Sequence, residues 1–399
     1  MTLGFKTAVR KSTLSVLFSV VFLDNLGFAI VVPYLFFYVQ ALGGSTFIYG
    51  LLLASYSIMS FIFTPIVARF SDRYGRRKIM LAALAIASFS YFLFGSAQAV
   101  WLLFVGRMLS GTTAATVPIA QAYVADVTTK EKRLRYLGLL GAAAGIAFIL
   151  GPGIGGTLSA LYGYAVPSYL AAALAFSNLI LAYFLLPEPS AFNLKRTVLS
   201  FQNLLSSIKK KAMILLLSIY FLFFVTFVFL QSALSPWLQT VFGFGSLQTG
   251  LIFFFIGSVS VITQAFLLPQ LNKKISTANL VLLGIVCFLI SMAILTFVSN
   301  IGVMLLVISF SAFGFGIQIV TYNTLISLNT SESAQGSTLG VAWAIAGAAQ
   351  STAPVLATAI FGIGISLGFV GLVFLASVLI GLSTVPLVLI FKTSERNGS

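Results

Sequence analysis

The sequence has no histidine, a single cysteine and seven acidic residues, and each scarcity excludes a kind of site. Histidine is the usual metal ligand and proton shuttle, and one cysteine, Cys287, supports neither a disulfide framework nor a cysteine metal cluster. No Gly-x-x-x-x-Gly-Lys-Ser/Thr loop is present to bind nucleotide phosphates. We therefore expect no metal and no cofactor, and we expect that the protein is not an enzyme.

Charged residues are scarce as a whole, at 7% of the chain, whereas hydrophobic residues make up 59% and the mean hydropathy is +1.09. These values lie outside the range of soluble proteins. Because a membrane-crossing helix needs about 20 predominantly apolar residues, twelve helices with short connections nearly fill the 399 residues. The composition therefore predicts an all-α membrane protein without a separate soluble domain.

The positions of the cations predict the topology. Of the 22 Lys and Arg residues, 21 lie in alternate gaps between long apolar runs, and the gaps in between carry no charge. The cationic gaps hold Lys6, Arg10 and Lys11; Arg69 to Lys78; Lys130 to Arg135; Lys195 to Lys211; Lys273 and Lys274; and Lys392 and Arg396. Because Lys and Arg accumulate in cytoplasmic loops, we predict twelve spans in the cell (plasma or inner) membrane, with both termini cytoplasmic. The net charge of +15 then faces anionic lipids rather than nucleic acid.

The predicted spans are 12–40, 47–68, 78–97, 100–125, 134–160, 165–186, 212–242, 246–269, 278–298, 301–328, 335–360 and 366–391. The first follows a short basic stretch and is expected to be an uncleaved start-transfer helix. The one long connection, 187–211, continues after two prolines as an apolar stripe with helical spacing. This stripe indicates a short amphipathic helix on the cytoplasmic interface, although a plain linker fits it as well.

Two pairs of prolines suggest an internal duplication. Pro33 and Pro236, in the first and seventh spans, are 203 residues apart, and Pro152 and Pro354, in the fifth and eleventh, are 202 apart. Many transporters are built from such repeats of six spans. We predict two pseudo-symmetric six-helix bundles, 1–186 and 212–399, joined by the 187–211 connection; coincidence of the prolines is the alternative.

Two charges lie inside spans, Asp24 in the first and Arg107 in the fourth. A charge at a helix centre costs about 2.5–3.5 kcal/mol on insertion scales, so each should face a partner or a water-filled cavity. The two side chains could meet, directly or through water, and form a static ion pair. The other interpretation is a proton site, in which Asp24 changes protonation with its surroundings and Arg107 tunes it.

The gap after the second span, from Ala68 to Lys78, contains a dense motif made of Asp72, Arg73, Gly75, Arg76 and Arg77. Its spacing resembles the loop signature of the major facilitator superfamily, Gly-x-x-x-Asp-Arg-x-Gly-Arg-Arg, with Ala68 in place of the leading Gly. The aspartate can cap the following helix, and the arginines can reach helix C-termini and neighbouring acids. We expect this cluster to act as a conformational latch.

The resemblance extends to the drug/proton antiporters of this superfamily, close to tetracycline and multidrug exporters. It covers Asp24-Asn25-Leu26-Gly27 with Pro33, Arg107 to Gly111, Asp126 with Arg133, and Gly151 to Gly156. It implies that Arg107 takes part in proton transfer, that Asp126 and Arg133 join the latch, and that Gly151, Pro152, Gly155 and Gly156 form an antiporter motif. The small residues of that motif allow tight helix packing. The later spans carry no acid or His, unlike those of tetracycline exporters, which argues against tetracycline as the substrate.

The resemblance thus implies a monomeric secondary transporter that exports hydrophobic or amphiphilic small molecules in exchange for protons, surrounded by membrane lipids. A facilitator or importer of a small metabolite and a lipid flippase remain alternatives. We expect the substrate cavity between the two halves, near the midplane. Its polar and aromatic candidates, about half of which should only join neighbouring helices, are Asn25, Phe28, Tyr56, Gln121, Gln231, Gln318, Tyr322, Asn323, Trp343 and Gln350.

Overall fold

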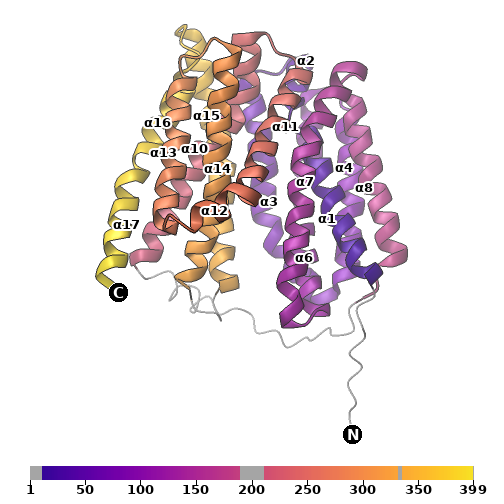
Figure 1. The fold of residues 1–399 in the computed structure, drawn as a ribbon. Helices are drawn as coiled ribbons and strands as arrows, with labels where there is room; N and C mark the ends of the chain where they lie inside the picture. The colour runs from indigo at the N-terminus through magenta and orange to yellow at the C-terminus, as the bar shows by residue number, and fades with distance from the viewer. Residues whose placement is uncertain (1–10, 189–210, 331–334, 399) are drawn as a thin grey trace.

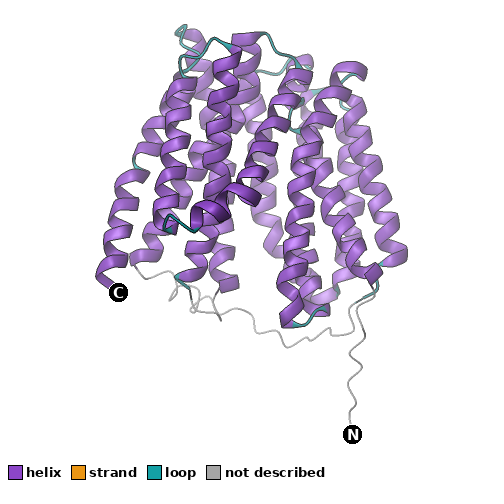
Figure 2. Cartoon of the chain, viewed as in Figure 1, coloured by secondary structure: helices purple, strands orange, loops and turns teal. Residues whose placement is uncertain are grey.

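The computed structural model describes residues 11–188, 211–330 and 335–398, and their regular structure is helical throughout (Figures 1 and 2). Within these ranges, twelve helical segments are long and apolar enough to cross a membrane. The prediction of an all-α protein with twelve spans is therefore confirmed. The amphipathic helix expected in the 187–211 connection falls almost wholly outside the described residues.

The first six spans are formed by eight helices, because the first and fourth spans are each made of two. Their bounds are α1 Lys11–Val31, α2 Leu35–Ala41, α3 Thr46–Tyr74, α4 Arg76–Gly95, α5 Val100–Thr112, α6 Thr116–Val127, α7 Lys130–Tyr162 and α8 Ala165–Leu185. The last six spans comprise α10 Lys211–Phe242, α11 Ser246–Ile262, the π-helix η1 Thr263–Leu267, α12 Leu268–Asn272, α13 Thr277–Leu295, α14 Ile301–Leu328, α15 Gln335–Ser366, α16 Leu372–Leu382 and α17 Thr384–Gly398.

Four spans differ from the continuous helices predicted, and one of them, the eighth, contains the π-helix η1 between α11 and α12. The segment predicted at 12–40 is interrupted between α1 and α2, where Pro33 lacks the N–H group of an α-helix. The fourth span is interrupted between α5 and α6, where the N–H of Thr113 bonds to the carbonyl oxygen of Ser110 at 3.2 Å, a tighter turn than the α-helical one. The last span begins at Leu372 rather than 366, because Gly368 adopts a φ of +70° that ends the preceding helix.

The buried apolar side chains form clusters within each half of the chain. Two clusters draw only on residues between Val16 and Leu186, and two draw only on residues between Met213 and Phe391. Figure 1 shows that α1 begins and α17 ends at the same side of the molecule, which we call the terminal side. Because the chain alternates direction, the cationic junctions between α3 and α4 and between α6 and α7 also lie there.

The two halves meet at the side opposite the termini, where α7 crosses α11 and α3 crosses α15. A Cβ atom added at Gly156 in α7 would lie 2.8 Å from the Cα of Gly250 in α11. Farther along the same helices, a Cβ at Gly145 would lie 4.0 Å from Val261, and a Cβ at Gly141 would meet no atom within 4 Å. The helices therefore separate toward the terminal side.

The second crossing has the same form. A Cβ at Gly50 in α3 would collide with the hydroxyl of Thr358 and lie 2.9 Å from the carbonyl oxygen of Pro354, both in α15. Beside these crossings, the Gln239 amide donates a hydrogen bond of 2.9 Å to the Gln40 side-chain oxygen. The described conformation is thus held closed at the side opposite the termini by close backbone contacts and one amide pair.

Candidate functional site

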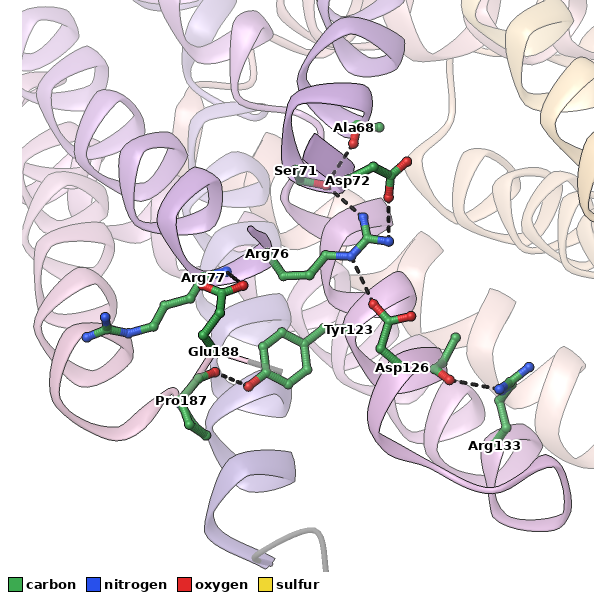
Figure 3. Close-up of polar contacts among 11 residues, drawn as sticks. Ala68, Ser71, Asp72, Arg76, Arg77, Tyr123, Asp126, Arg133, Pro187 and Glu188 are labelled. Atoms are coloured by element: carbon green, nitrogen blue, oxygen red, sulfur yellow. Dashed lines mark hydrogen bonds and ion pairs between the residues drawn. The ribbon is translucent and has the colours of Figure 1, made fainter. Parts of the chain in front are cut away.

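Arg76 is the centre of the cluster at the start of α4 (Figure 3). Its guanidinium is buried and contacts three side chains: the Asp72 carboxylate at 2.5 Å, the Asp126 carboxylate at 3.1 Å and the Ser71 hydroxyl at 2.8 Å. These partners come from α3 and α6, so a single arginine joins three helices. The turn that delivers it is made by Gly75, whose φ of +108° suits glycine alone among ordinary residues.

Arg77 contacts a different part of the chain, the end of α8. Its guanidinium donates to the Tyr183 carbonyl oxygen at 2.6 Å and lies over the Tyr183 ring. Its backbone N–H points to the Glu188 carboxylate at 3.4 Å, so this acid sits at the N-terminus of α4, where a helix dipole favours negative charge. The Tyr123 hydroxyl donates to the Pro187 carbonyl oxygen in the same region (Figure 3).

The other predicted latch residues take separate positions. Arg133 donates to the Ala125 carbonyl oxygen at 2.7 Å, near the C-terminal end of α6. Arg73 is exposed and lies over the neighbouring Tyr74 ring, away from the acids. Sequence reasoning missed Ser71 and Glu188; an acid placed directly after the sixth span, on the same side as the basic loop, was the available signal for Glu188.

Arg107 is buried in α5, with 3% of its surface exposed, and its contacts are aromatic. Its guanidinium carbon lies 4.7 Å from the centre of the Tyr56 ring and 5.5 Å from the centre of the Phe28 ring. Both distances are typical of cation–π contacts. Among the described residues, no ion pair joins Arg107 to Asp24.

Asp24 is half-buried in α1, one turn before Phe28. Tyr56 of α3 and Tyr91 of α4 lie near Asp24. The Tyr91 ring packs on the same part of α1, since a Cβ at Gly27 would lie 3.2 Å from it. The acid and the arginine therefore share aromatic neighbours, although they do not touch each other.

The glycines of the predicted antiporter motif lie on two faces of α7. Gly151 and Gly155 face α1, where added Cβ atoms would collide with Ala29 and with the Ile30 backbone. Gly156 and the carbonyl oxygen of Pro152 face α11 at Gly250. The motif thus packs against both the helix that carries Asp24 and a helix of the other half.

The predicted cavity residues divide into several groups. Gln318 is fully buried and donates to the Val281 carbonyl oxygen of α13 at 2.6 Å, which is a contact between neighbouring helices. Tyr322 is also fully buried, edge-on to Tyr220 at 5.3 Å. Asn25 donates to the Val21 carbonyl oxygen within its own helix. Gln121 and Trp343 are exposed, and Gln231 and Gln350 are half-buried.

Asn323 lines a cleft of about 460 Å³ near the terminal side. The cleft lies between the π-helix η1 and α14, and its lining consists of Gln264, Ile319, Val320, Asn323, Thr324, Ser327 and Leu328. A π-helix inside an α-helix frequently marks a functional site. Sequence reasoning missed Gln264, because nothing in its local pattern predicted that η1 would turn it toward α14.

Two half-buried phenylalanines of the second half form a second pair of aromatic rings in contact, besides Phe28 and Tyr56. Phe227 of α10 and Phe315 of α14 stack face to face, with ring centres 4.0 Å apart. Sequence reasoning did not select this pair, because 39 phenylalanines are too many to rank one by one.

Twelve membrane-spanning helices, with an acid and an arginine within the first and fourth spans, define a multi-pass membrane transporter. The model of the Major Facilitator Superfamily matches residues 17–354, so the chain belongs to this superfamily, as the motifs predicted.

Named relatives include two resistance proteins and a solved transporter. Tetracycline resistance protein, class C, of Escherichia coli is 29% identical over 357 residues, which are 88% of this chain and 90% of that protein. Multidrug resistance protein 2 of Bacillus subtilis (strain 168) is 30% identical over 306 residues, 73% of this chain and 74% of that protein. A bacterial homologue of the human lysosomal transporter Spinster, in an inward-facing and occupied conformation, shares the fold with a TM-score of 0.82 at 13% identity, over 96% of this chain and 97% of that one.

Proposed function

We propose that this protein is a proton-coupled exporter of hydrophobic or amphiphilic small molecules that works by alternating access between two six-helix bundles. The names of the tetracycline and multidrug resistance relatives favour export over uptake. The separation of the buried clusters into residues 16–186 and 213–391 supports two bundles as the moving bodies. The protein then acts as a monomer, with its substrate and protons as its ligands.

The distribution of charge supports a cytoplasmic terminal side. The described cations outside Arg107 lie at this side, at the junctions around α3–α4 and α6–α7, at Lys273 and Lys274, and at Lys392. By the positive-inside rule this side faces the cytoplasm. Since the bundles meet at the other side, the described conformation is then inward-facing.

The observation that carries the proposal is the position of Asp24. It is a half-buried acid within a span, and it is not paired with the arginine that lies nearby behind Tyr56 and Phe28. An ionised carboxylate there is costly, so binding a proton stabilises the site. One proton that moves inward across the membrane supplies about 2.3 kcal/mol per 100 mV, enough to drive a neutral compound outward.

Two pairs of aromatic rings support hydrophobic or amphiphilic compounds as the substrate class. Phe28 and Tyr56 pack together in the first half of the chain, Phe227 and Phe315 stack in the second half, and all four are half-buried. Such surfaces bind apolar and amphiphilic compounds, whereas sugars need many convergent hydrogen bonds. The Lys and Arg residues of the second half lie at the terminal ends of its spans or in the gaps between them, and none lies near the middle of a span to hold a phosphate group.

The test uses the protein in proteoliposomes with a panel of neutral and cationic amphiphilic dyes. Asp24→Asn should abolish uphill transport driven by a proton gradient but spare downhill exchange, and Asp24→Glu should retain part of the uphill transport. Unchanged concentrative transport by Asp24→Asn would refute the proton site. If a labelled sugar, amino acid or lipid is transported and none of the dyes is, the exporter hypothesis is wrong. A facilitator or importer of a small metabolite, or a lipid flippase, is then the better assignment.

A further inference from the structure

The buried Arg107 guanidinium lies among ring faces rather than among acids. Tyr56 lies 4.7 Å and Phe28 5.5 Å from it, and these two rings are themselves 5.0 Å apart. Its Nε atom has no hydrogen-bond partner among the described residues. A cation in this position depends on the negative faces of the rings for compensation, and such contacts strengthen when water is excluded.

Close backbone packing fixes the Tyr56 ring. Gly111 lies one turn after Arg107 in α5, and a Cβ there would lie 2.6 Å from the carbonyl oxygen of Tyr56 and 2.8 Å from the Cβ of Met59. The absence of a side chain at Gly111 therefore allows α3 to approach α5 at the level of Tyr56. On the other face of α5, a Cβ at Gly106 would lie 3.1 Å from the Ser90 carbonyl oxygen of α4.

A second set of contacts fixes the Phe28 ring. Its neighbours in α1, Ala29 and Ile30, pack directly on Gly151 and Gly155 of α7. The Phe148 ring of α7 also meets Phe28, with ring centres 6.0 Å apart and a steep angle of 69°. Since the next residue of α7, Ile149, touches Gly257 of α11, movement between the bundles is transmitted to the helix that holds Phe28.

We propose that Tyr56 and Phe28 are positioning residues that hold the Arg107 guanidinium by their ring faces and away from Asp24 in this conformation. The carboxyl group is then able to take up a proton, because no adjacent cation stabilises its ionised form. When a substrate binds beside these rings and separates them, the guanidinium is able to approach the carboxylate, which releases the proton while the terminal side is still open. This inference rests on the proposed role of Asp24 as the proton site.

Among the described residues, the titratable groups near Arg107 are the tyrosines 34, 49, 56 and 91, which come from the start of α2, from α3 and from α4. Tyr56 and Tyr91 also lie near Asp24. Tyrosines stay neutral in the physiological range, so a pH response there belongs to the carboxyl group.

The decisive comparison is Tyr56→Phe against Tyr56→Leu, because the first keeps the ring face and the second keeps a bulky apolar side chain without it. The assay measures substrate-induced proton release by purified protein over a range of pH. Tyr56→Phe should keep the wild-type midpoint, whereas Tyr56→Leu should move it to lower pH by about one unit, a tenfold change in proton affinity. Tyr162→Leu, which removes an exposed ring at the end of α7, is the control and should change nothing.

A second measurement separates this inference from the proposed function. If wild-type protein releases no protons, the proposed coupling fails, and the ring contact is then tested by melting temperature alone. The changes in melting temperature caused by Tyr56→Leu and Arg107→Gln should not add in the double variant, because both remove the same contact. Tyr56→Phe should keep this contact, so its change in melting temperature should add to that of Arg107→Gln. The inference is overturned if Tyr56→Leu keeps the wild-type midpoint, if Tyr56→Phe shifts it as much as Tyr56→Leu does, or if the two substitutions are additive.

Discussion

Replacing Gly156 with alanine should weaken the contact between α7 and α11 at the side opposite the termini. The added methyl group would lie 2.5 Å from the Ser246 carbonyl oxygen and 2.8 Å from the Cα of Gly250. Both are backbone atoms, so no side chain can rotate out of the way. The helices must move apart at this point, which favours the conformation in which this side is open.

The size of the effect follows from the cost of overpacking. Inserting a methyl group into a well-packed contact costs about 1–3 kcal/mol. Alanine also improves helix propensity by about 1 kcal/mol over glycine, but this gain is shared by both conformations and cancels in the equilibrium between them. The closed conformation should therefore lose a factor of about 5 to 150 relative to the open one.

The assay reads closure directly at the amide pair that joins the halves. Gln40 and Gln239, whose side chains are hydrogen-bonded at 2.9 Å, are both replaced by cysteine in a Cys287→Ser background. A bifunctional thiol reagent should link them rapidly in the parent protein and more slowly after Gly156→Ala. Because the rate follows the closed fraction, the slowdown can reach but not exceed the change of about 5- to 150-fold in the equilibrium.

The control is Gly141→Ala in the same helix, where a Cβ meets no atom within 4 Å. It adds the same methyl group and the same helix propensity, so it should leave the crosslinking rate unchanged. If Gly156→Ala crosslinks as fast as Gly141→Ala while remaining folded, the contact at Gly156 does not hold this side closed and our interpretation of it is wrong.

Three further substitutions test the roles that the contacts suggest. Arg76→Gln removes the ion pair between Arg76 and the largely buried Asp126 and should reduce the free energy of unfolding by about 3 kcal/mol, read as a lower melting temperature, with partial recovery in Arg76→Lys. Gln318→Met removes only the bond to Val281, so transport should keep its KM; a raised KM would place Gln318 in the substrate path. Asn323→Ala, in the cleft beside η1, should raise the KM for transported dyes, and an unchanged KM would exclude the cleft from substrate binding.

The number of spans could be predicted because it depends on two strong and independent signals, the length of apolar runs and the alternation of cations. The interruptions could be predicted only in part. Pro33 is a recognisable helix breaker, yet Pro152 and Pro354 lie inside long helices, so the residue type alone does not decide where a span is interrupted. The turn at Thr113 comes shortly before Pro118, which lacks the N–H that would bond to the Ala114 carbonyl oxygen in a continuous helix, but this proline was not recognised as a point of interruption.

The members of the charged sites could be proposed from motif spacing, but their partners could not. Arg73 and Arg76 have equal standing in the motif, and the turn at Gly75 places one of them in solvent and the other between two acids. Likewise, sequence distance suggested that Arg107 could reach Asp24. The packing of α3 on Gly111 instead places a ring over the guanidinium, and no periodicity reports such a contact.

The spacing between the contact residues of the two crossings bears on the proposed internal repeat. Gly50 and Gly250 are 200 positions apart, Gly156 and Thr358 are 202 apart, and Gln40 and Gln239 are 199 apart. In each crossing, a glycine early in one helix meets the segment one turn beyond a proline in a helix of the other half. A duplication of six spans would create two such crossings at once, related by the same pseudo-symmetry. The charged motifs, by contrast, occur in the first half alone. The two crossings therefore depend on the close approach of the helix backbones and do not require a matching charged motif in the second half.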